Sequence, residues 1–328
     1  MSTTTSGITQ DEAEIYDRQI RLWGLDAQQR IRNARVLIAG MRALSDEVCK
    51  NIALAGVGSI TLLDHDTIKE EDLGAQFFLS AKDIGKNRAE ASAPAIQQLN
   101  PRVNVVVDQD DIVNKPDDFF NNFDIVCLFH KEIGILERVN TLRRKVGKPF
   151  YTADAFGWFG YIFCDLVKHT YIEERKSESR GKKSGEEPKV QRTTCVEEYA
   201  SFEQSLRSDW SAKGKKVKRL SPLSFVIHVL FKFEQDHGRS PTEKDIPQIL
   251  AQKDKYLEAM GVKDSNLLQD ELIKDVVSLL DTEMAPVAAI VGGVLAQEMI
   301  KVLSAKELPI QNWFYYSGLD GSGMIHQI

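Results

Sequence analysis

Gly40, Arg42 and Ser45 stand where a phosphate-binding loop would lie, at a turn between an apolar run and a helical segment. A nucleotide loop of the form G-x-G-x-x-G uses glycines because bare backbone must approach the phosphates at the start of a helix. Only Gly40 matches this pattern, and the side chain of Arg42 would obstruct a bound phosphate, although its charge could attract one. We therefore expect a tight turn without a bound nucleotide here.

Asp64 and Asp66 follow about 20 residues later, where a dinucleotide site usually places the carboxylate that binds the ribose. Since the second and third glycines of the loop are missing, this acidic pair is weak evidence for a cofactor. The sequence does not favour a nicotinamide-dependent dehydrogenase.

The four cysteines are scattered, and they are Cys49, Cys127, Cys164 and Cys195. They contain no C-x-x-C pair, so the sequence predicts neither a metal site nor a disulfide framework. The first three fall in apolar segments, where a buried and unreactive thiol is expected.

Short apolar runs alternate with helical patterns through the first half of the chain. Helices are expected at 11–22 and 26–33, and Arg18 and Arg21 lie one turn apart on the first of them. Next come strands at 35–40, 59–64, 103–107, 123–128 and 149–152, and helices at 45–55, 85–99 and 133–146. Apolar strands separated by helices predict an α/β fold with a doubly wound, Rossmann-like sheet covered on both faces.

The composition changes after residue 168 and predicts an interruption of the sheet domain. Residues 173–192 are almost entirely charged residues, Ser and Gly, so we expect 169–220 to be a charged, flexible loop. A helical insertion at 221–282 follows, with helical patterns at 223–237, 242–260 and 266–280. The sheet domain is therefore expected in two parts, 11–168 and 283–328, the second with a helix at 285–303 and a hairpin of 313–316 and 324–327.

The overall composition is that of a soluble globular protein. The chain has 328 residues, of which 42% are hydrophobic and 27% charged, and its formal net charge is -6. This charge gives no reason to expect nucleic acid as a partner, because phosphate backbones need a basic face. The first ten residues lack the features of a secretory signal, and we find no apolar stretch of the roughly 18 to 20 residues that span a bilayer. We expect an intracellular protein without a membrane partner.

The most specific motif is YDRQIRLWG at residues 16–24. It resembles the opening motif of the adenylating domains of ubiquitin-like activating enzymes and of their bacterial relatives in molybdopterin and thiamine synthesis, the ThiF and MoeB family. The order downstream agrees: AGVG at 55–58, LLDHD at 62–66, QFF at 76–78, DIGKNRAE at 83–90 and LNP at 99–101. Within the family, MAPV at 284–287 and VGGVLAQE at 291–298 look most like the small, non-catalytic subunits that serve SUMO.

The resemblance also shows what this chain lacks. Active members adenylate the C-terminal glycine of the modifier with ATP and Mg²⁺, but the arginine of their phosphate-binding stretch is Ala75 here. Their magnesium-binding Asp-Asn pair is replaced by His130 and Lys131, and no cysteine has the setting of their thioester nucleophile. Lys86 matches an ATP-contacting lysine of the family, but without its companions a surface lysine is the better interpretation. The chain is expected to be a pseudo-adenylation domain that binds no cofactor and no metal in cis and has no independent activity.

What the resemblance assigns to this chain is a role in trans. In the resembling heterodimers the arginine at the position of Arg18 reaches the ATP phosphates held by the large catalytic subunit, and Arg21 would support it. The implied partners are that large subunit, which binds ATP and Mg²⁺, and a SUMO-like modifier. The implied location is the nucleus, and the basic run at 213–219 is either an import signal or a solvated loop.

Three alternatives stay open on the sequence. Arg18 and Arg21 could be plain solvated charges on an amphipathic helix, in a chain that is purely a structural scaffold subunit. The chain could be a self-sufficient homodimeric adenylyltransferase with an atypical loop. It could also pair with the activating enzyme of another ubiquitin-like modifier. Gly292 and Gly293 are read as glycines that let the 285–303 helix pack closely on the sheet.

Overall fold

The central element of the computed structural model, which describes residues 7–176 and 190–328, is an eight-stranded sheet. Its strands are β1 (Arg35–Ala39), β2 (Ser59–Leu63), β3 (Asn104–Asp108), β4 (Ile125–Phe129), β5 (Phe150–Phe156), β6 (Phe159–Asp165), β9 (Trp313–Ser317) and β10 (Ser322–His326). They lie in the order β10-β9-β6-β5-β4-β1-β2-β3. The five strands from β3 to β5 pair in parallel, and β6, β9 and β10 add an antiparallel edge.

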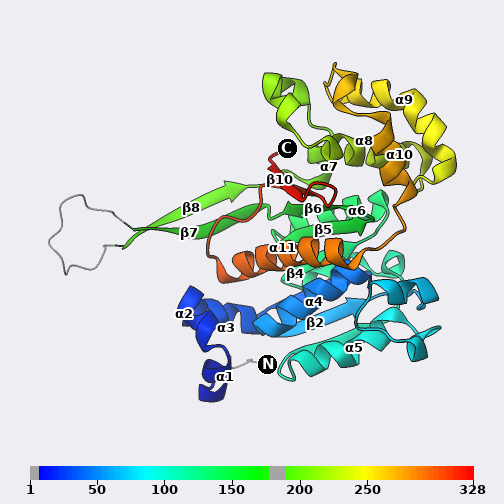
Figure 1. Ribbon diagram of the computed structural model, residues 1–328. Coiled ribbons are helices and arrows are strands. Elements are labelled where there is room, and N and C mark those ends of the chain that lie inside the picture. The colour runs from blue at the N-terminus through cyan, green and yellow to red at the C-terminus, as the bar shows by residue number, and fades with distance from the viewer. Residues whose placement is uncertain (1–6, 177–189) are drawn as a thin grey trace.

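Helices cover both faces of this sheet because successive side chains of each strand point to opposite sides. In β1, Val36 and Ile38 enter one hydrophobic core, and Leu37 and Ala39 enter the other. The first core is completed by α3 (Leu25–Asn33), α4 (Ala43–Ala55), α5 (Arg88–Leu99) and α11 (Ala285–Ser304). The second is completed by α6 (Ile133–Lys145), α8 (Pro222–His237), α9 (Ile246–Ala259) and α10 (Asp270–Ser278) (Figure 1). The predicted doubly wound α/β fold is confirmed.

The helix predicted at 11–22 is two helices, α1 (Gln10–Ile15) and α2 (Asp17–Trp23). They meet at Tyr16, whose φ of -97° and ψ of 14° interrupt the helical backbone. A capping box between Thr9 and Glu12 starts α1. At its other end, α2 stops at Gly24, which has a φ of +91°.

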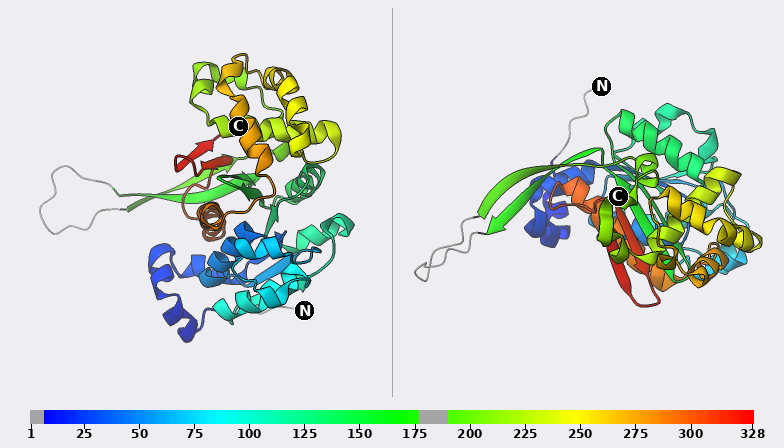
Figure 2. Two further views of the ribbon diagram at one scale, coloured as in Figure 1. Left: turned by 45° about the vertical axis from the view of Figure 1, so that its right-hand side comes forward. Right: turned by 90° about the horizontal axis from the view of Figure 1, so that it is seen from above.

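The region predicted as a charged loop contains regular structure, so that prediction was wrong for most of its described residues. Two strands, β7 (Lys168–Lys176) and β8 (Val190–Glu198), pair antiparallel and project from the body in both views of Figure 2. After them come α7 (Phe202–Leu206) and a 3-10 segment, η5 (Trp210–Arg219). Residues 177–189 of the predicted loop lie outside the described residues, as do 1–6 of the predicted N-terminal segment.

The helical insertion begins as predicted, because Ser221 precedes α8 and Pro222 occupies its first turn. The two later helices start several residues after the predicted positions, since short 3-10 turns precede them. The remaining 3-10 turns of the described chain are η1 (Glu70–Gly74), η2 (Ala81–Asp83), η3 (Ile112–Asn114), η4 (Asp117–Asn122), η6 (Glu243–Asp245) and η7 (Ser265–Leu267).

One helix corrects the expectation about apolar stretches. With 20 residues, α11 is long and apolar enough to cross a membrane by length and composition alone. Half of its apolar window is buried in the protein, where Val291 and Leu295 belong to the core between α4 and the sheet. This is the environment of a core helix.

Candidate functional site

The degenerate nucleotide loop connects β1 to α4. Gly40 has a φ of +99°, and a Cβ there would lie 2.4 Å from the carbonyl oxygen of Phe129 in β4. This glycine is therefore required by the close approach of two strands, whether or not a ligand is present. Ser45, at the third glycine position, closes the turn: its Oγ accepts the Arg42 N–H at 2.7 Å and donates to the Arg42 carbonyl at 2.8 Å.

The side chain of Glu283 occupies the N-terminal end of α4. Its Oε1 accepts the Ala43 N–H at 2.8 Å and lies 3.4 Å from Nε of Arg42. Its Oε2 accepts a hydrogen bond from Nε2 of Gln76 at 3.1 Å. A helix N-terminus favours an anion because its first N–H groups are unsatisfied and the helix dipole is positive there. In this chain, a carboxylate from the far end of the sequence is that anion.

The acidic pair predicted as a possible ribose ligand is held by the protein itself. Asp64 is buried, and its carboxylate accepts the backbone N–H groups of Met41 and Asp66. Asp66 lies 3.3 Å from Arg88, which also forms a two-pronged pair with Asp72 at 3.0 and 2.9 Å. Asp64, His65 and Asp66 place one ligand atom each within 4.8 Å of one another, but their contacts are explained by the fold.

His130, Lys131 and Lys86, the other positions that the motif comparison singled out, are also held by neighbours. His130 has a φ of +48°, and its Nδ1 lies 2.9 Å from Asp154. Lys131 extends over Gly40, so that its Cε would be 3.3 Å from a Cβ at that glycine. Lys86 forms an ion pair with Asp83 at 2.9 Å. Hydrogen bonds from Ser80, and then from Lys86, lower the pKa of Asp83 to about 2.

A cavity of about 580 Å³ lies in front of the loop. Six carboxylates and four Lys or Arg side chains line it: Asp64, Asp66, Glu71, Asp72, Asp281, Glu283, Arg42, Lys69, Arg88 and Lys131. This excess of negative charge is unfavourable for a triphosphate.

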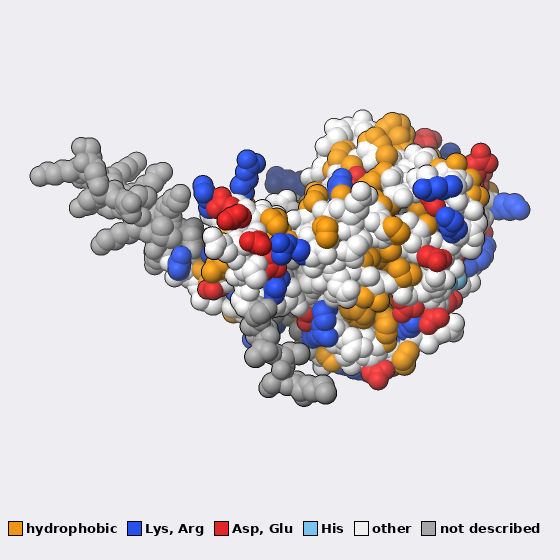
Figure 3. All heavy atoms as spheres, turned by 90° about the horizontal axis from the view of Figure 1, so that it is seen from below, with side chains coloured by type: hydrophobic (Ala, Val, Ile, Leu, Met, Phe, Trp, Pro, Cys, Tyr) orange, Lys and Arg blue, Asp and Glu red, His pale blue; other side chains and the backbone are white. Residues whose placement is uncertain are grey.

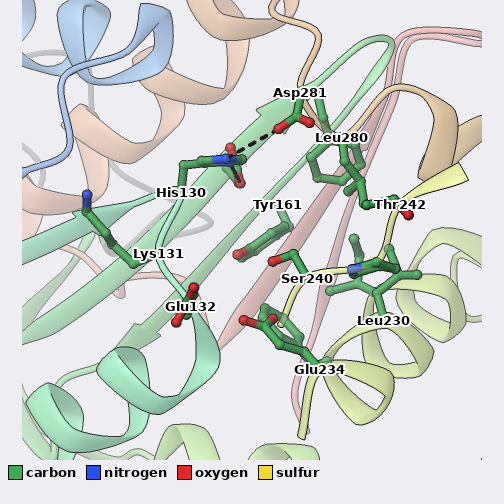
Figure 4. A pocket seen from close by; sticks show the side chains of 15 residues that line it. His130, Lys131, Glu132, Tyr161, Leu230, Glu234, Ser240, Thr242, Leu280 and Asp281 are labelled. Atoms are coloured by element: carbon green, nitrogen blue, oxygen red, sulfur yellow. Dashed lines mark hydrogen bonds and ion pairs between the residues drawn. The ribbon is translucent and has the colours of Figure 1, made fainter. Parts of the chain in front are cut away.

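A second cavity of about 330 Å³ adjoins the first, and both are lined by His130, Lys131 and Asp281. Figure 4 shows the hydroxyl of Tyr161 and the carboxylate of Glu234 pointing toward its centre, above an apolar floor. Burial raises the pKa of Glu234, whose Oε1 accepts the Ile133 N–H that begins α6.

Three of the cysteines are buried, as predicted: Cys49, Cys127 and Cys164. Burial raises the pKa of each thiol well above its usual value, so none is a ready nucleophile. Cys195 is partly exposed on β8.

Arg18 lies on α2, is exposed, and makes no hydrogen bond or ion pair with any residue that the structure describes. Arg21 differs, because it pairs with Asp17 one turn earlier at 3.0 Å. The two predicted site residues therefore share a short helix. Arg21 is paired with Asp17, whereas the guanidinium of Arg18 has no hydrogen bond or ion pair among the described residues.

The other residues of the 16–24 motif fix α2 to the end of α4. Asn100 donates to the Tyr16 hydroxyl at 2.8 Å, and the ring of Tyr16 covers Gly56, where a Cβ would lie 2.5 Å from it. Trp23 donates to Gln28, and Gln28 donates to the Ala55 carbonyl at 3.0 Å. Residues of the 16–24 motif thus meet residues from distant segments here. These contacts hold the backbone that carries Arg18.

This anchor point is far from the chain's own nucleotide loop. Gln19 contacts the carbonyl of Leu54 at the last turn of α4, whereas the loop precedes the first turn (Figure 1). α4 has 13 residues, and at the α-helical rise it is about 20 Å long. Because an arginine side chain is much shorter than this, Arg18 cannot serve the loop of its own chain.

A model of the ThiF family matches residues 16–327. The chain belongs to the ThiF family. Among similar proteins, SUMO-activating enzyme subunit 1 of Homo sapiens is 40% identical over 336 residues, which cover 97% of this chain and 96% of that protein. The Rattus norvegicus protein of the same name is 41% identical over 97% of this chain and 95% of its own length. The Danio rerio protein is 40% identical over 97% and 95%.

The ThiF fold is also found in the crystal structure of SeMet PaaA. The alignment covers 100% of this chain and 76% of that chain, with a TM-score of 0.57 and 14% sequence identity. At this identity the likeness concerns the fold alone. The resemblance inferred from the motifs, together with the similarity to the SUMO-activating small subunit, is confirmed.

Glu283 was not among the residues that the sequence pointed to. It is 240 positions from Ala43, with which it forms a hydrogen bond. The available signals were an arginine in place of a loop glycine, which needs a nearby anion when it is buried, and a glutamate directly before the MAPV segment.

Proposed function

We propose that this chain is the smaller, non-catalytic subunit of a heterodimeric SUMO-activating enzyme and that it donates Arg18 in trans to the ATP site of a larger subunit. The observation that carries the proposal is the exposed guanidinium of Arg18, which pairs with none of the described residues and lies on a helix fixed by contacts at Tyr16 and Trp23. Similarity to subunit 1 of SUMO-activating enzymes over 97% of the chain supports the enzyme and its modifier.

The proposed chemistry of Arg18 is electrostatic. When the C-terminal carboxylate of the modifier attacks the α-phosphate of ATP, negative charge builds on the β and γ phosphates as pyrophosphate leaves. A guanidinium can donate two parallel hydrogen bonds to phosphate oxygens and stabilise that charge, which an ammonium group cannot reproduce in geometry. Arg21 is proposed to support the site indirectly, because its ion pair with Asp17 stiffens α2.

The surroundings of Arg18 suit a protein partner. Ile15 at the end of α1, Leu22 in α2 and Leu25 at the start of α3 are 61%, 78% and 54% exposed. Exposed apolar side chains grouped around a charged residue are typical of a surface that another protein covers. We propose that the large subunit covers them and that it holds ATP and Mg²⁺, with none held by this chain.

We also propose a nuclear location, which rests on the resemblance. The basic run at 213–219 gives it little support, because Val217 is buried and Lys213 donates to the carbonyl of Gln327. Lys218 forms an ion pair with Asp264. Imaging of the full chain fused to a fluorescent protein would test the location.

Modifier-dependent ATP–pyrophosphate exchange by the assembled heterodimer tests the role of Arg18. We expect Arg18→Ala to lower kcat by about 100-fold to 1,000-fold, as for the loss of one preorganised donor. Arg18→Lys should recover only part of this loss. Arg21→Ala is the matched control on the same helix and should lower the rate by less than about tenfold.

Two results would contradict the proposal in different ways. Normal exchange by the Arg18→Ala heterodimer would leave the chain a scaffold. Exchange by the purified chain without a large subunit would instead identify a self-sufficient adenylyltransferase.

A further inference from the structure

The N-terminal end of α4 is filled from within the chain, and we infer that Glu283 is a built-in anion that keeps phosphate out of this position. The inference deepens the proposed function, because it explains how a chain of this family can retain the loop's shape without retaining its ligand. It concerns only this chain's own pocket and is independent of the surface that carries Arg18.

Two hydrogen-bond donors and one positively charged side chain surround the Glu283 carboxylate. The Ala43 N–H belongs to the first turn of a 13-residue helix, Arg42 supplies a full positive charge, and Gln76 supplies an amide N–H. The side chains of Arg42 and Glu283 are only 15% and 12% exposed, so water screens their attraction weakly. A helix terminus, a guanidinium and an amide are the groups that would also bind a phosphate.

The backbone holds Glu283 in this place. Thr282 donates its N–H to the carbonyl of Leu279, and its own carbonyl accepts the Gly157 N–H at 2.7 Å. On the other side, α11 begins at Ala285 with a proline in its first turn. The backbone on both sides of Glu283 is thus fixed by the β5–β6 turn and by the start of α11.

A second acid, Asp46, lies close to Glu283 at the same helix end. Asp46, in the first turn of α4, is fully buried, and burial raises the pKa of its carboxyl well above the usual value, with Glu283 as the next contributor. The Ala43 N–H and the Gln76 amide both donate to Glu283 and not to Asp46. In front of Glu283 lies the cavity of about 580 Å³, so shortening this side chain opens the donors to solutes.

Binding of inorganic pyrophosphate to the full-length chain, without Mg²⁺, tests the inference by isothermal titration calorimetry. Wild-type protein should bind it weakly. Glu283→Ala removes the competing carboxylate, so the affinity should rise about tenfold or more. Adding Arg42→Ala to this variant should abolish the gain, which locates the bound anion.

Glu71→Gln is the matched control. Glu71 lines the same cavity and is 72% exposed in an ion pair with Lys69, but it does not touch the end of α4. The Glu71→Gln variant removes one negative charge without freeing the helix donors. Its affinity for pyrophosphate should therefore differ from that of the wild type by less than about threefold.

Glu283→Gln keeps the inference testable if the alanine variant does not fold, as judged by circular dichroism. The glutamine can still accept the Ala43 N–H, yet it releases the charge of Arg42, so a gain of about threefold or more is expected. A folded alanine variant without any gain, a glutamine variant without any gain when alanine does not fold, or wild-type binding as tight as the variant's would overturn the inference. None of these outcomes affects the result expected for Arg18→Ala in the heterodimer assay, so the two proposals can fail separately.

Discussion

At the scale of single residues, two buried histidines are built into the region where the insertion meets the β9–β10 hairpin. His228 of α8 contacts the Trp210 and Trp313 rings, and its Nδ1 lies 2.9 Å from the Ser224 carbonyl. His326 of β10 accepts the Ser221 N–H at its Nε2. This acceptor role requires an unprotonated Nε2. The neutral form of the His326 ring is thus part of the folded state.

Acid should weaken this region before most carboxylates titrate. Burial lowers the pKa of His228 to about 4, and burial, followed by Lys213, lowers the pKa of His326 to about 4. Since the unfolded chain takes up these protons near pH 6.5, the stabilisation is present above pH 6.5 and is lost as the pH falls toward 4. Each histidine contributes a slope of up to about 1.4 kcal/mol per pH unit in this window. Urea unfolding between pH 7 and 5 measures it.

The matched variant for this prediction is His326→Gln. Its amide oxygen can accept the Ser221 N–H but does not titrate, so the variant should lose about half of the pH dependence that the two histidines produce. Unchanged dependence on pH in a folded variant would rule out His326 as a source.

At the scale of elements, the packing of α11 depends on where small residues lie. A Cβ on Gly292 would be 2.7 Å from Cβ of Glu47 and 3.0 Å from the Leu44 carbonyl, so this glycine lets α11 approach α4. The sequence had assigned this role to packing on the sheet. There, Gly160 of β6 provides the space instead, since a Cβ would meet Val291 at 2.8 Å. Gly293 has open space.

Neighbouring glycines of α11 should therefore respond oppositely to alanine. Gly292→Ala forces two helices apart and should destabilise the chain by about 1–3 kcal/mol. Gly293→Ala adds a better helix former where nothing is in the way and should stabilise it by about 0.5–1 kcal/mol. Urea unfolding of both variants checks the pair. Stabilisation by both variants would show that helix propensity, and not the α4 contact, decides the outcome.

The central strands could be read from the sequence because each is buried on both faces. Ile38, Leu62 and Cys127 are adjacent across β1, β2 and β4 and fully buried, so these strands are continuous apolar runs. The β7–β8 ribbon was missed because it pairs many polar residues, as with Glu173 opposite Thr193, and its composition resembles that of a loop. The split of the first helix at Tyr16 depends on contacts with Gly56 and Asn100, which no local pattern contains.

For the site, too, the sequence revealed the features that lie in one local segment and missed those that depend on distant contacts. Loss of the nucleotide-loop glycines was visible in one local segment, and so was the motif around Arg18. The anion that replaces the ligand was not, because a contact over 240 positions leaves no periodic signal. Whether a charged side chain is uncommitted, as Arg18 is, or paired, as Arg21 is, also depends on the folded neighbourhood.

At the scale of the whole molecule, charges of both signs are mixed over the face that Figure 3 shows. Figure 3 shows basic and acidic side chains interspersed over one face, with hydrophobic side chains gathered between them. This mixture agrees with a formal net charge of -6 and with recognition by a protein. What marks the segment around Arg18 is therefore not its charge but its exposed apolar side chains, those of Ile15, Leu22 and Leu25.

If the chain pairs with a large subunit as proposed, a change at Leu22 should weaken that association more than it weakens folding. Leu22 is 78% exposed, so Leu22→Asp should change the free energy of unfolding of the isolated chain by no more than about 0.5 kcal/mol. If the partner buries this side chain, the same change should raise the Kd of the heterodimer about tenfold to 100-fold. Leu319→Asp is the control, because Leu319 is 61% exposed in the turn between β9 and β10 and should leave the Kd unchanged. Equal effects of both variants on Kd would place the partner elsewhere and remove the support that α2 gives to Arg18 in trans.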